Sequence, residues 1–500
     1  MTPEQLHDAL GMLPADLVAE TDRLRSRPPR KVIYWRSFAA AAACFLLVLG
    51  CGLFAMNRLP AAFDIATKEA MLEESVLAAP QAPAMAEPES AAQEDSANSV
   101  FDSFTDNAPE EGIPEPEEAL RDLMEDVPTG EGEVLDVIDD TAMANFAVQL
   151  FQNTATTEEN TLLSPLSVMS ALAMTANGAD GETLAQMETV MGMDVSMLTS
   201  TLHNYRNSQT DHLKLANSIW FNESSLLTVR DEFLLTNAYH FGADFYEVPM
   251  NPATCGAINN WVNEKTEGMI PEILDEIPMD AMMYLVNALA FEAEWPEVYL
   301  DTSVQASTFT KEDGTEQEVE LMHSSEYQYI EDELATGFIK PYKGGDYAFV
   351  ALLPNEGVSV ADYIASLSGE HLLEMLRNPV DTKVFAAIPK FESEYSADMA
   401  EVLKEMGMAH AFDAEKADFS RIGSCEAGNL HIGRVLHKTT ITVAEQGTKA
   451  GAATVVEILC GSAFTPDPKE VTLDRPFLYM LIDCRQNIPF FIGTVMDMEN

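Results

Sequence analysis

One segment near the C-terminal end alternates between small or β-branched side chains and a more polar set. The side chains of a strand point alternately to its two faces. One face of this segment would carry Thr448, Ala450, Ala452, Thr454, Val456 and Ile458. The other face would carry Gly447, Lys449, Gly451, Ala453, Val455 and Glu457, so both charges can stay in water. The pattern predicts an exposed segment that can later enter a packed sheet, and an ordinary surface linker is the alternative.

A second pattern is an uninterrupted apolar run over residues 38–56, about the minimum needed to cross a hydrocarbon core of ~30 Å. Six basic residues lie before it, between Arg23 and Arg36, and only Arg58 follows it before Lys68. The positive-inside rule therefore predicts a cytoplasmic tail over residues 1–37 and a transmembrane anchor over 38–56. A cleaved signal peptide, or a lipoprotein signal ending at Cys51, is the alternative, which the long basic region before the run disfavours.

Residues 57–139 are rich in Ala, Pro and Glu, and beyond Arg58 only Lys68 and Arg121 are basic. So few aromatic and β-branched residues cannot offset the entropy of ordering. We expect an acidic, disordered linker that holds the folded residues 140–500 away from the membrane. The chain would then be a single-pass protein of the cell membrane whose C-terminal domain is extracellular.

Charge and motifs exclude several function classes. The formal charge of -54, from 82 acidic and 28 basic residues, argues against nucleic acid as a partner. The chain has no GxSxG, HExxH, GxxxxGKS/T or GxGxxG motif, so we predict no enzyme, no cofactor and no metal site. Six cysteines without a CxxC predict no disulfide framework, and buried thiols are expected at Cys255, Cys425 and Cys484.

Short motifs in a fixed order over residues 140–500 resemble the serpin family. The first are the segments 160–167, 171–174, 178–183, 215–221, 258–268 and 285–291, the last followed by Trp295. The later ones are Pro341-Tyr342, Pro389-Lys390-Phe391, the segment 417–420, His437-Lys438, Arg475-Pro476-Phe477 and the segment 489–493. Each motif alone is weak evidence, but their joint order and spacing make a chance match negligible.

The resemblance implies an α+β serpin fold with three β-sheets, eight or nine helices and an exposed reactive-centre loop over residues 445 to about 470. It also implies that a serine protease cleaves this loop and forms a covalent acyl-enzyme. The cleaved arm would then enter the central sheet and trap the protease, which makes the chain a suicide inhibitor. With the anchor, we expect a monomeric, membrane-anchored member of bacterial type.

The resemblance assigns roles to individual residues. The hinge of the loop corresponds to Glu445, Gly447, Thr448, Ala450, Ala452 and Ala453. The shutter and breach, which govern opening of the central sheet, correspond to Ser164, Ser167, Asn287, Trp295 and His437. Counting fifteen residues from the hinge glycine, as in the family, places the scissile bond between Gly461 and Ser462.

The residues around this bond, 459–463, are small and apolar, which favours elastase-like or subtilisin-like proteases. Cleavage at Cys460-Gly461 or after Phe464 is the alternative. No Arg or Lys occurs between Thr454 and Pro468, which disfavours trypsin-like proteases. Two other functions stay open, a non-inhibitory serpin-like binding protein and a membrane signalling protein that senses cleavage of the loop.

Overall fold

The computed structural model describes residues 121–123, 132–223, 226–277, 281–426, 428–448 and 467–499. The expected tail (1–37), the expected anchor (38–56) and most of the expected linker (57–139) lie outside the described residues. Within the described residues, no helix has the length and apolar character needed to span a membrane.

Within the described residues, packing against the domain begins before residue 140. The backbone N–H of Leu135 donates to Ser200 Oγ (3.1 Å), and Asn204 Nδ2 donates to the carbonyl oxygens of Leu135 and Val137. Asp139 then caps the first long helix by accepting from the N–H of Ala142. These contacts offset the conformational entropy that residues 132–139 lose on ordering. Their acidic composition alone did not indicate such contacts.

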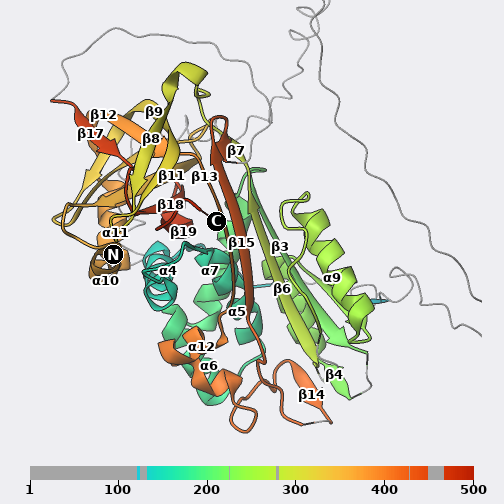
Figure 1. Cartoon of the computed structure of the whole chain (residues 1–500). Coiled ribbons are helices and arrows are strands. Elements are labelled where there is room, and N and C mark those ends of the chain that lie inside the picture. Colours follow the sequence, from blue (N-terminus) through green and yellow to red (C-terminus); the bar gives the residue numbers. More distant parts are fainter. Residues whose placement is uncertain are drawn as a thin grey trace, which may run out of the picture. The chain divides into compact units, whose positions relative to one another are not determined.

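The described residues form nine α-helices (Figure 1). They are α4 (Asp140–Thr154), α5 (Pro165–Ala176), α6 (Gly181–Met191), α7 (Val195–Ser208), α8 (Asp231–Phe241), α9 (Pro252–Lys265), α10 (Val360–Ser366), α11 (Gly369–Arg377) and α12 (Ala400–Leu403). Helix α5 begins with Pro165 in its first turn, and the Ser164 hydroxyl accepts from the N–H of Ser167. Because almost all of its residues are apolar or small, α5 is buried on every side.

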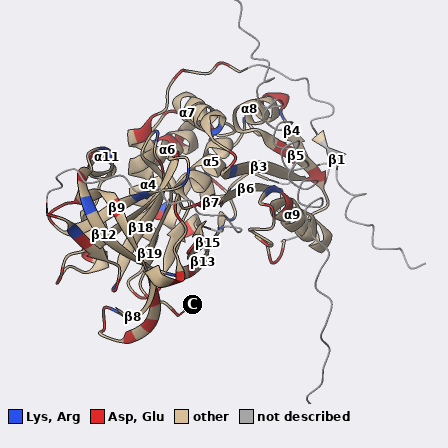
Figure 2. Ribbon diagram, turned by 90° about the horizontal axis from the view of Figure 1, so that it is seen from above, with Lys and Arg blue, Asp and Glu red and all other residues tan. Residues whose placement is uncertain are grey.

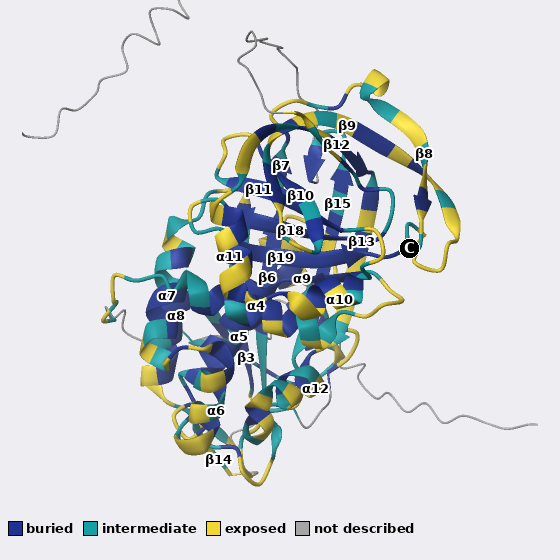
Figure 3. Cartoon of the chain, turned by 90° about the vertical axis from the view of Figure 1, so that its left-hand side faces the viewer, coloured by how far each residue is buried: buried dark blue, intermediate teal, exposed yellow. Residues whose placement is uncertain are grey.

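One large sheet has the strand order β17-β12-β9-β10-β11-β18-β19-β2, with β8 paired to β9. Its strands are β2 (Thr161–Leu163), β8 (Val304–Thr310), β9 (Glu316–Glu331), β10 (Ala335–Pro341), β11 (Tyr347–Pro354), β12 (Val380–Pro389), β17 (Lys469–Thr472), β18 (Phe477–Asp483) and β19 (Ile488–Val495). Every residue of β11, β18 and β19 is buried, and Figure 3 shows these strands inside the domain. They form the centre of the main hydrophobic core.

The central sheet consists of two four-stranded halves. One half has the order β1-β5-β3-β6, with β1 (Arg121–Asp122), β3 (Leu213–Asn222), β5 (Ala243–Val248) and β6 (Met283–Phe291). The other has the order β13-β15-β16-β7, with β7 (Ala293–Glu294), β13 (Phe391–Asp398), β15 (Leu436–Ala444) and β16 (Gly447–Thr448). A separate pair is formed by β4 (Leu227–Val229) and β14 (Gly423–Cys425).

These sheets give the expected α+β serpin fold. Their strands are grouped by hydrogen bonding differently from the three sheets expected. Among the described strands, β6 and β15 are not paired with each other, so the central sheet is divided. The long strand β9 pairs with β8 over residues 316–322, with β12 over residues 321–329 and with β10 over residues 328–331, so all of these strands form one sheet. Pairing of strands so distant in sequence is not encoded in local alternation.

Helices α5 and α9 cover opposite faces of the central sheet. Leu289 and Phe291 of β6 belong to the main core, which includes α5, whereas Val286 and Ala288 belong to a second core with α9. This division follows from the alternation of side chains along a strand. Figure 2 shows the acidic residues on outer helices, loops and the β8–β9 hairpin, while the inner strands are largely uncharged.

Three cysteines are described, and all three are free thiols. Cys255 is buried as expected, but Cys425 and Cys484 are only partly buried. The expectation of a buried thiol is therefore confirmed for Cys255 and wrong in degree for the other two.

Candidate functional site

The hinge residues Gly447 and Thr448 form the short strand β16 inside the second half of the central sheet, between β15 and β7. On one side, β16 pairs with β15 through Thr448 and Val443 and through Gly447 and Ala444. On the other side, it pairs with β7 through Thr448 and Ala293 and through Gly447 and Glu294. The chain thus turns back at residues 445–446, here called the hinge turn, and enters the sheet for two residues.

Gly447 is the residue that this reversal requires. Its φ of +147° lies in a region that side chains rarely adopt. A Cβ at this position would also lie 2.2 Å from the carbonyl oxygen of Ala293, inside any acceptable contact distance. A larger residue would therefore force β16 out from between β15 and β7.

Two aromatic residues hold the hinge turn through their backbones. The N–H of Trp295 donates to the carbonyl of Gln446 (2.9 Å), and the N–H of Tyr299 donates to the carbonyl of Glu445 (3.0 Å). The indole N–H of Trp295 donates to the carbonyl of Ala444 (2.9 Å). The sequence predicted Trp295 at the point where insertion begins, and the structure places it in direct contact with the hinge turn.

The side chain of Thr448 is buried, with 2% of its surface exposed, and it lies next to the aromatic residue Tyr342. Its hydroxyl lies 2.5 Å from the hydroxyl of Tyr342, and the Tyr342 ring stacks on Trp295 with centroids 4.4 Å apart. Burial raises the pKa of Tyr342 well above its ordinary value, so the phenol stays neutral. The Pro341-Tyr342 motif was visible in the sequence, but a contact between residues so far apart was not.

An ion pair marks the outer side of the hinge turn. Lys390 Nζ lies 2.8 Å from Glu445 Oε1 and 2.7 Å from Glu320 Oε2, and all three side chains are at least partly exposed. The hydrogen bond from Lys390 lowers the pKa of Glu445. Surface pairs of this kind typically contribute up to ~1 kcal/mol, so this pair orients the turn more than it stabilises the fold.

The four expected shutter residues lie together where α5 begins beneath β6 and β15. The N–H of Ser164 donates to His437 Nε2 (3.1 Å), and the hydroxyl of Ser167 donates to Asn287 Oδ1. Asn287 Nδ2 in turn donates to Asn217 Oδ1 (2.6 Å) on β3. A single polar network therefore connects the start of α5 to strands of both halves of the central sheet.

Burial lowers the pKa of His437 to about 4, so the imidazole is neutral at pH 7. In the unfolded chain the same group takes up a proton near its ordinary pKa of 6.5. Stability from the neutral histidine is therefore complete above pH 6.5 and is lost as the pH falls toward 4. The loss reaches at most about 3 kcal/mol for this residue, from ~1.4 kcal/mol per pKa unit.

We expect the thermal midpoint to decrease between pH 6.5 and 4, and the decrease to be smaller in His437→Gln, whose amide oxygen can still accept from Ser164. His240 has a pKa of about 4, through burial and then the neighbouring His203 and Arg206, so some decrease stays in the variant. Calorimetry of both proteins across this pH range provides the measurement. Equal pH dependence in parent and variant would contradict the assignment to His437.

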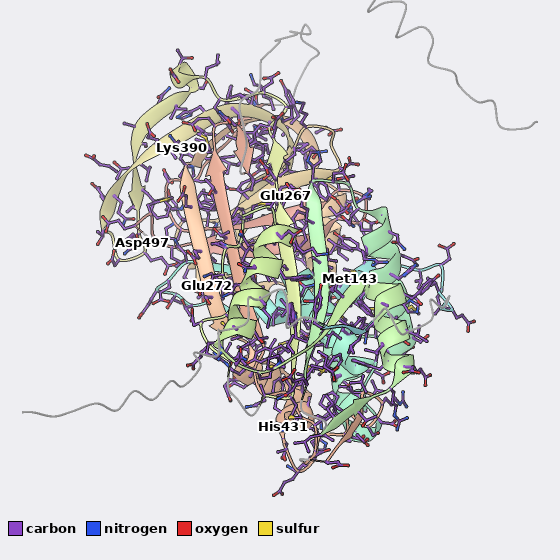
Figure 4. The ribbon with its side chains drawn as sticks, turned by 90° about the vertical axis from the view of Figure 1, so that its right-hand side faces the viewer. Met143, Glu267, Glu272, Lys390, His431 and Asp497 are labelled. Carbon is purple, nitrogen blue, oxygen red and sulfur yellow. The ribbon has the colours of Figure 1, made fainter. Side chains whose placement is uncertain are left out.

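A cavity of about 300 Å³ lies between the halves of the central sheet, here called the slot. Its floor is α5, with Val168 and Leu172, and its walls are β6 and β15, with Leu285 and Asn287 on one side and Leu436 and His437 on the other. Figure 4 shows Lys390 and His431 near opposite ends of this region, His431 being in the loop that lines the slot. The hinge strand β16 lies at one end of the division, and the slot lies along β6 and β15, which do not pair with each other among the described residues.

Five predicted site residues lie outside the described residues, namely Ala450, Ala452, Ala453, Gly461 and Ser462. Those that are described form two groups. Glu445, Gly447, Thr448 and Trp295 surround the hinge turn, and Ser164, Ser167, Asn287 and His437 form the shutter network. The described domain therefore has a two-residue strand at the hinge, a divided central sheet and a cavity between β6 and β15.

Comparison with known proteins identifies this class of domain. The model of the serpin (serine protease inhibitor) family matches residues 141–498. The leukocyte elastase inhibitor of Equus caballus is 30% identical over 363 residues, which cover 68% of this chain and 94% of the relative. The chain therefore belongs to the serpin family.

Two solved structures illustrate the range of the fold. The thermophilic serpin tengpin in its native state is 43% identical, with a TM-score of 0.71, and the match covers 76% of this chain and 100% of tengpin. Thyroxine-binding globulin in complex with thyroxine is 22% identical, with a TM-score of 0.63, covering 72% of this chain and 99% of the globulin. The second likeness is one of fold alone.

Proposed function

We propose that this chain is a suicide inhibitor of extracellular serine proteases of the elastase-like or subtilisin-like kind. The observation that carries the proposal is the placement of Gly447 and Thr448 as a strand between β15 and β7, at one end of a divided sheet. Support also comes from the inhibitory relative, the leukocyte elastase inhibitor.

The register at the hinge supports insertion of the following residues. If the antiparallel pairing continues from Thr448, Ala450 comes opposite Ile441 and Ala452 opposite Thr439 on β15, and both partners are buried. Thr454 then comes between His437 and Asn287, the two shutter residues that line the slot. The small, β-branched face recognised in the sequence is therefore the face that would turn toward the core.

Inhibition would begin with cleavage of the loop. The serine hydroxyl of the protease attacks the carbonyl carbon of Gly461, the bond to the nitrogen of Ser462 breaks, and the new amine leaves with a proton. The arm 449–461 is then free to insert while its end is esterified to the protease. Insertion competes with hydrolysis of the ester, and inhibition results when insertion is faster.

We expect a detergent-resistant complex with elastase or subtilisin and none with trypsin, because residues 459–463 are small and apolar. Electrophoresis after incubation detects the complex, and mass spectrometry of the released C-terminal peptide locates the bond. The peptide should begin at Ser462. Cleavage of the loop by every protease without any complex would instead favour a non-inhibitory binding protein.

We also propose that residues 38–56 anchor the protein in the cell membrane with its serpin domain outside, since basic residues precede this apolar run and are rare after it. A protease added to intact cells should remove the domain and leave residues before Phe38 protected. The reverse pattern would overturn the orientation. A new N-terminus between Cys51 and Ala62, without added protease, would show a cleaved signal.

A further inference from the structure

A buried charged pair lies directly behind the hinge turn. Lys340 of β10 is 6% exposed, and its Nζ donates to Glu326 Oε1 of β9 at 2.7 Å. Glu326 also accepts from Ser324 Oγ (2.6 Å), and Ser324 accepts from the hydroxyl of Tyr299 (3.1 Å). Burial alone would lower the pKa of Lys340, but Tyr299 and Glu326 outweigh burial and raise it, so the ammonium is charged.

The same ammonium lies over the two aromatic rings that belong to the residues holding the hinge turn. Lys340 Nζ is 5.0 Å from the ring centroid of Trp295 and 4.9 Å from that of Tyr299. A cation over an aromatic face is attracted to it most strongly where water is excluded. Lys340 therefore connects both rings to one another and to Glu326.

Stability alone does not account for this arrangement. A buried ion pair must lose its hydration, and replacement by apolar side chains of similar size is often neutral or stabilising. The neighbouring strand residues Phe338 and Ile339 are apolar, so a methionine at position 340 would suit the core as well. What an apolar residue would not supply is the directed attraction to both rings.

We propose that Lys340 and Glu326 are a positioning pair that keeps the hinge turn in register for insertion. The inference rests on the proposed inhibitory function. Trp295 and Tyr299 hold the carbonyls of Gln446 and Glu445, and the pair holds Trp295 and Tyr299. Without the ammonium the turn loosens, β16 leaves its place more often, and insertion after cleavage starts later.

The test uses the full-length chain with three changes: Lys340→Met, the double change Lys340→Met with Glu326→Met, and the control Lys343→Met. The control removes an ammonium of the same neighbourhood that is 64% exposed and pairs with Glu294. Hydrogen exchange of residues 441–448 reports the hinge directly. Titration of subtilisin with each protein gives the number of inhibitor molecules consumed per protease inactivated.

In Lys340→Met we expect exchange at the hinge to increase at least ten-fold and consumption of inhibitor to increase about three- to ten-fold. The rate of loop cleavage should change less than two-fold, because Gly461 lies far along the chain from the turn. The double variant should recover thermal stability, since no buried charge is left unpaired, but keep the fast exchange and the high consumption. Lys343→Met should behave as the parent.

Two results would overturn the inference. One is hinge exchange in Lys340→Met that equals that of the parent. The other is a double variant that recovers slow exchange together with stability, since the pair would then matter only for folding. If the parent forms no complex with subtilisin but Lys340→Met still exchanges faster at the hinge, the positioning role stands and the proposed function fails.

Discussion

Replacing Thr448 with arginine is expected to convert the protein from an inhibitor into a substrate. The side chain at this position is buried against the hydroxyl of Tyr342 and is the first inward-facing residue of the inserting arm. An arginine there would bury an unpaired charge, at a cost of several kcal/mol. It would keep β16 from its place between β15 and β7, so insertion would slow and hydrolysis of the acyl-enzyme would win.

The measurement is the yield of detergent-resistant complex together with the rate of loop cleavage. We expect Thr448→Arg to lower the yield at least ten-fold, by the several kcal/mol above, with cleavage at the same bond and at a similar rate. Lys449→Glu is the matched control, because residue 449 would face water in an inserted strand, and it should retain inhibition. A Thr448→Arg protein that inhibits as well as the parent would show that inhibition does not proceed through insertion.

The family motifs predicted the fold, and they placed the hinge at residues whose local chemistry suits a chain reversal. Gly447 is required by a positive φ and by the contact with Ala293, and a glycine followed by small residues is visible in sequence. Ser164 begins α5 as a cap before Pro165, which is also a local pattern. The family motifs then place Asn287 and His437 on the strands that reach this cap.

The contacts around the hinge turn were not predictable, because they depend on strand register and on burial across distant strands. From the sequence alone, Lys340 would be taken for a surface lysine. Only the pairing of β9 with β10 shows that Glu326 lies beside it. The division between β6 and β15 likewise depends on strands far apart in sequence. For residues 132–139 a signal did exist, since Leu135 and Val137 interrupt the acidic composition just before α4.

Cleavage of the loop is expected to make the protein markedly more stable. An inserted arm would pair with the facing edges of β6 and β15, which are not paired with each other among the described residues, and its face from Ala450 to Ile458 would enter the slot of about 300 Å³. The N-terminal end of the arm is already fixed in β16, which limits the entropy lost on ordering. These terms favour the inserted state, and the energy released is what would distort a trapped protease.

Calorimetry before and after limited cleavage within residues 459–464 measures this gain. A net stabilisation of about 5 kcal/mol raises the thermal midpoint by roughly 7 °C, since an unfolding entropy of ~2.1 cal/mol/K per residue gives ~1.3 °C per kcal/mol in a domain of about 360 residues. Cleaved Thr448→Arg should show little of this increase, because its arm cannot enter at the hinge. An unchanged midpoint in the cleaved parent would mean that the slot does not receive the arm, and the two sheet halves would then need another partner.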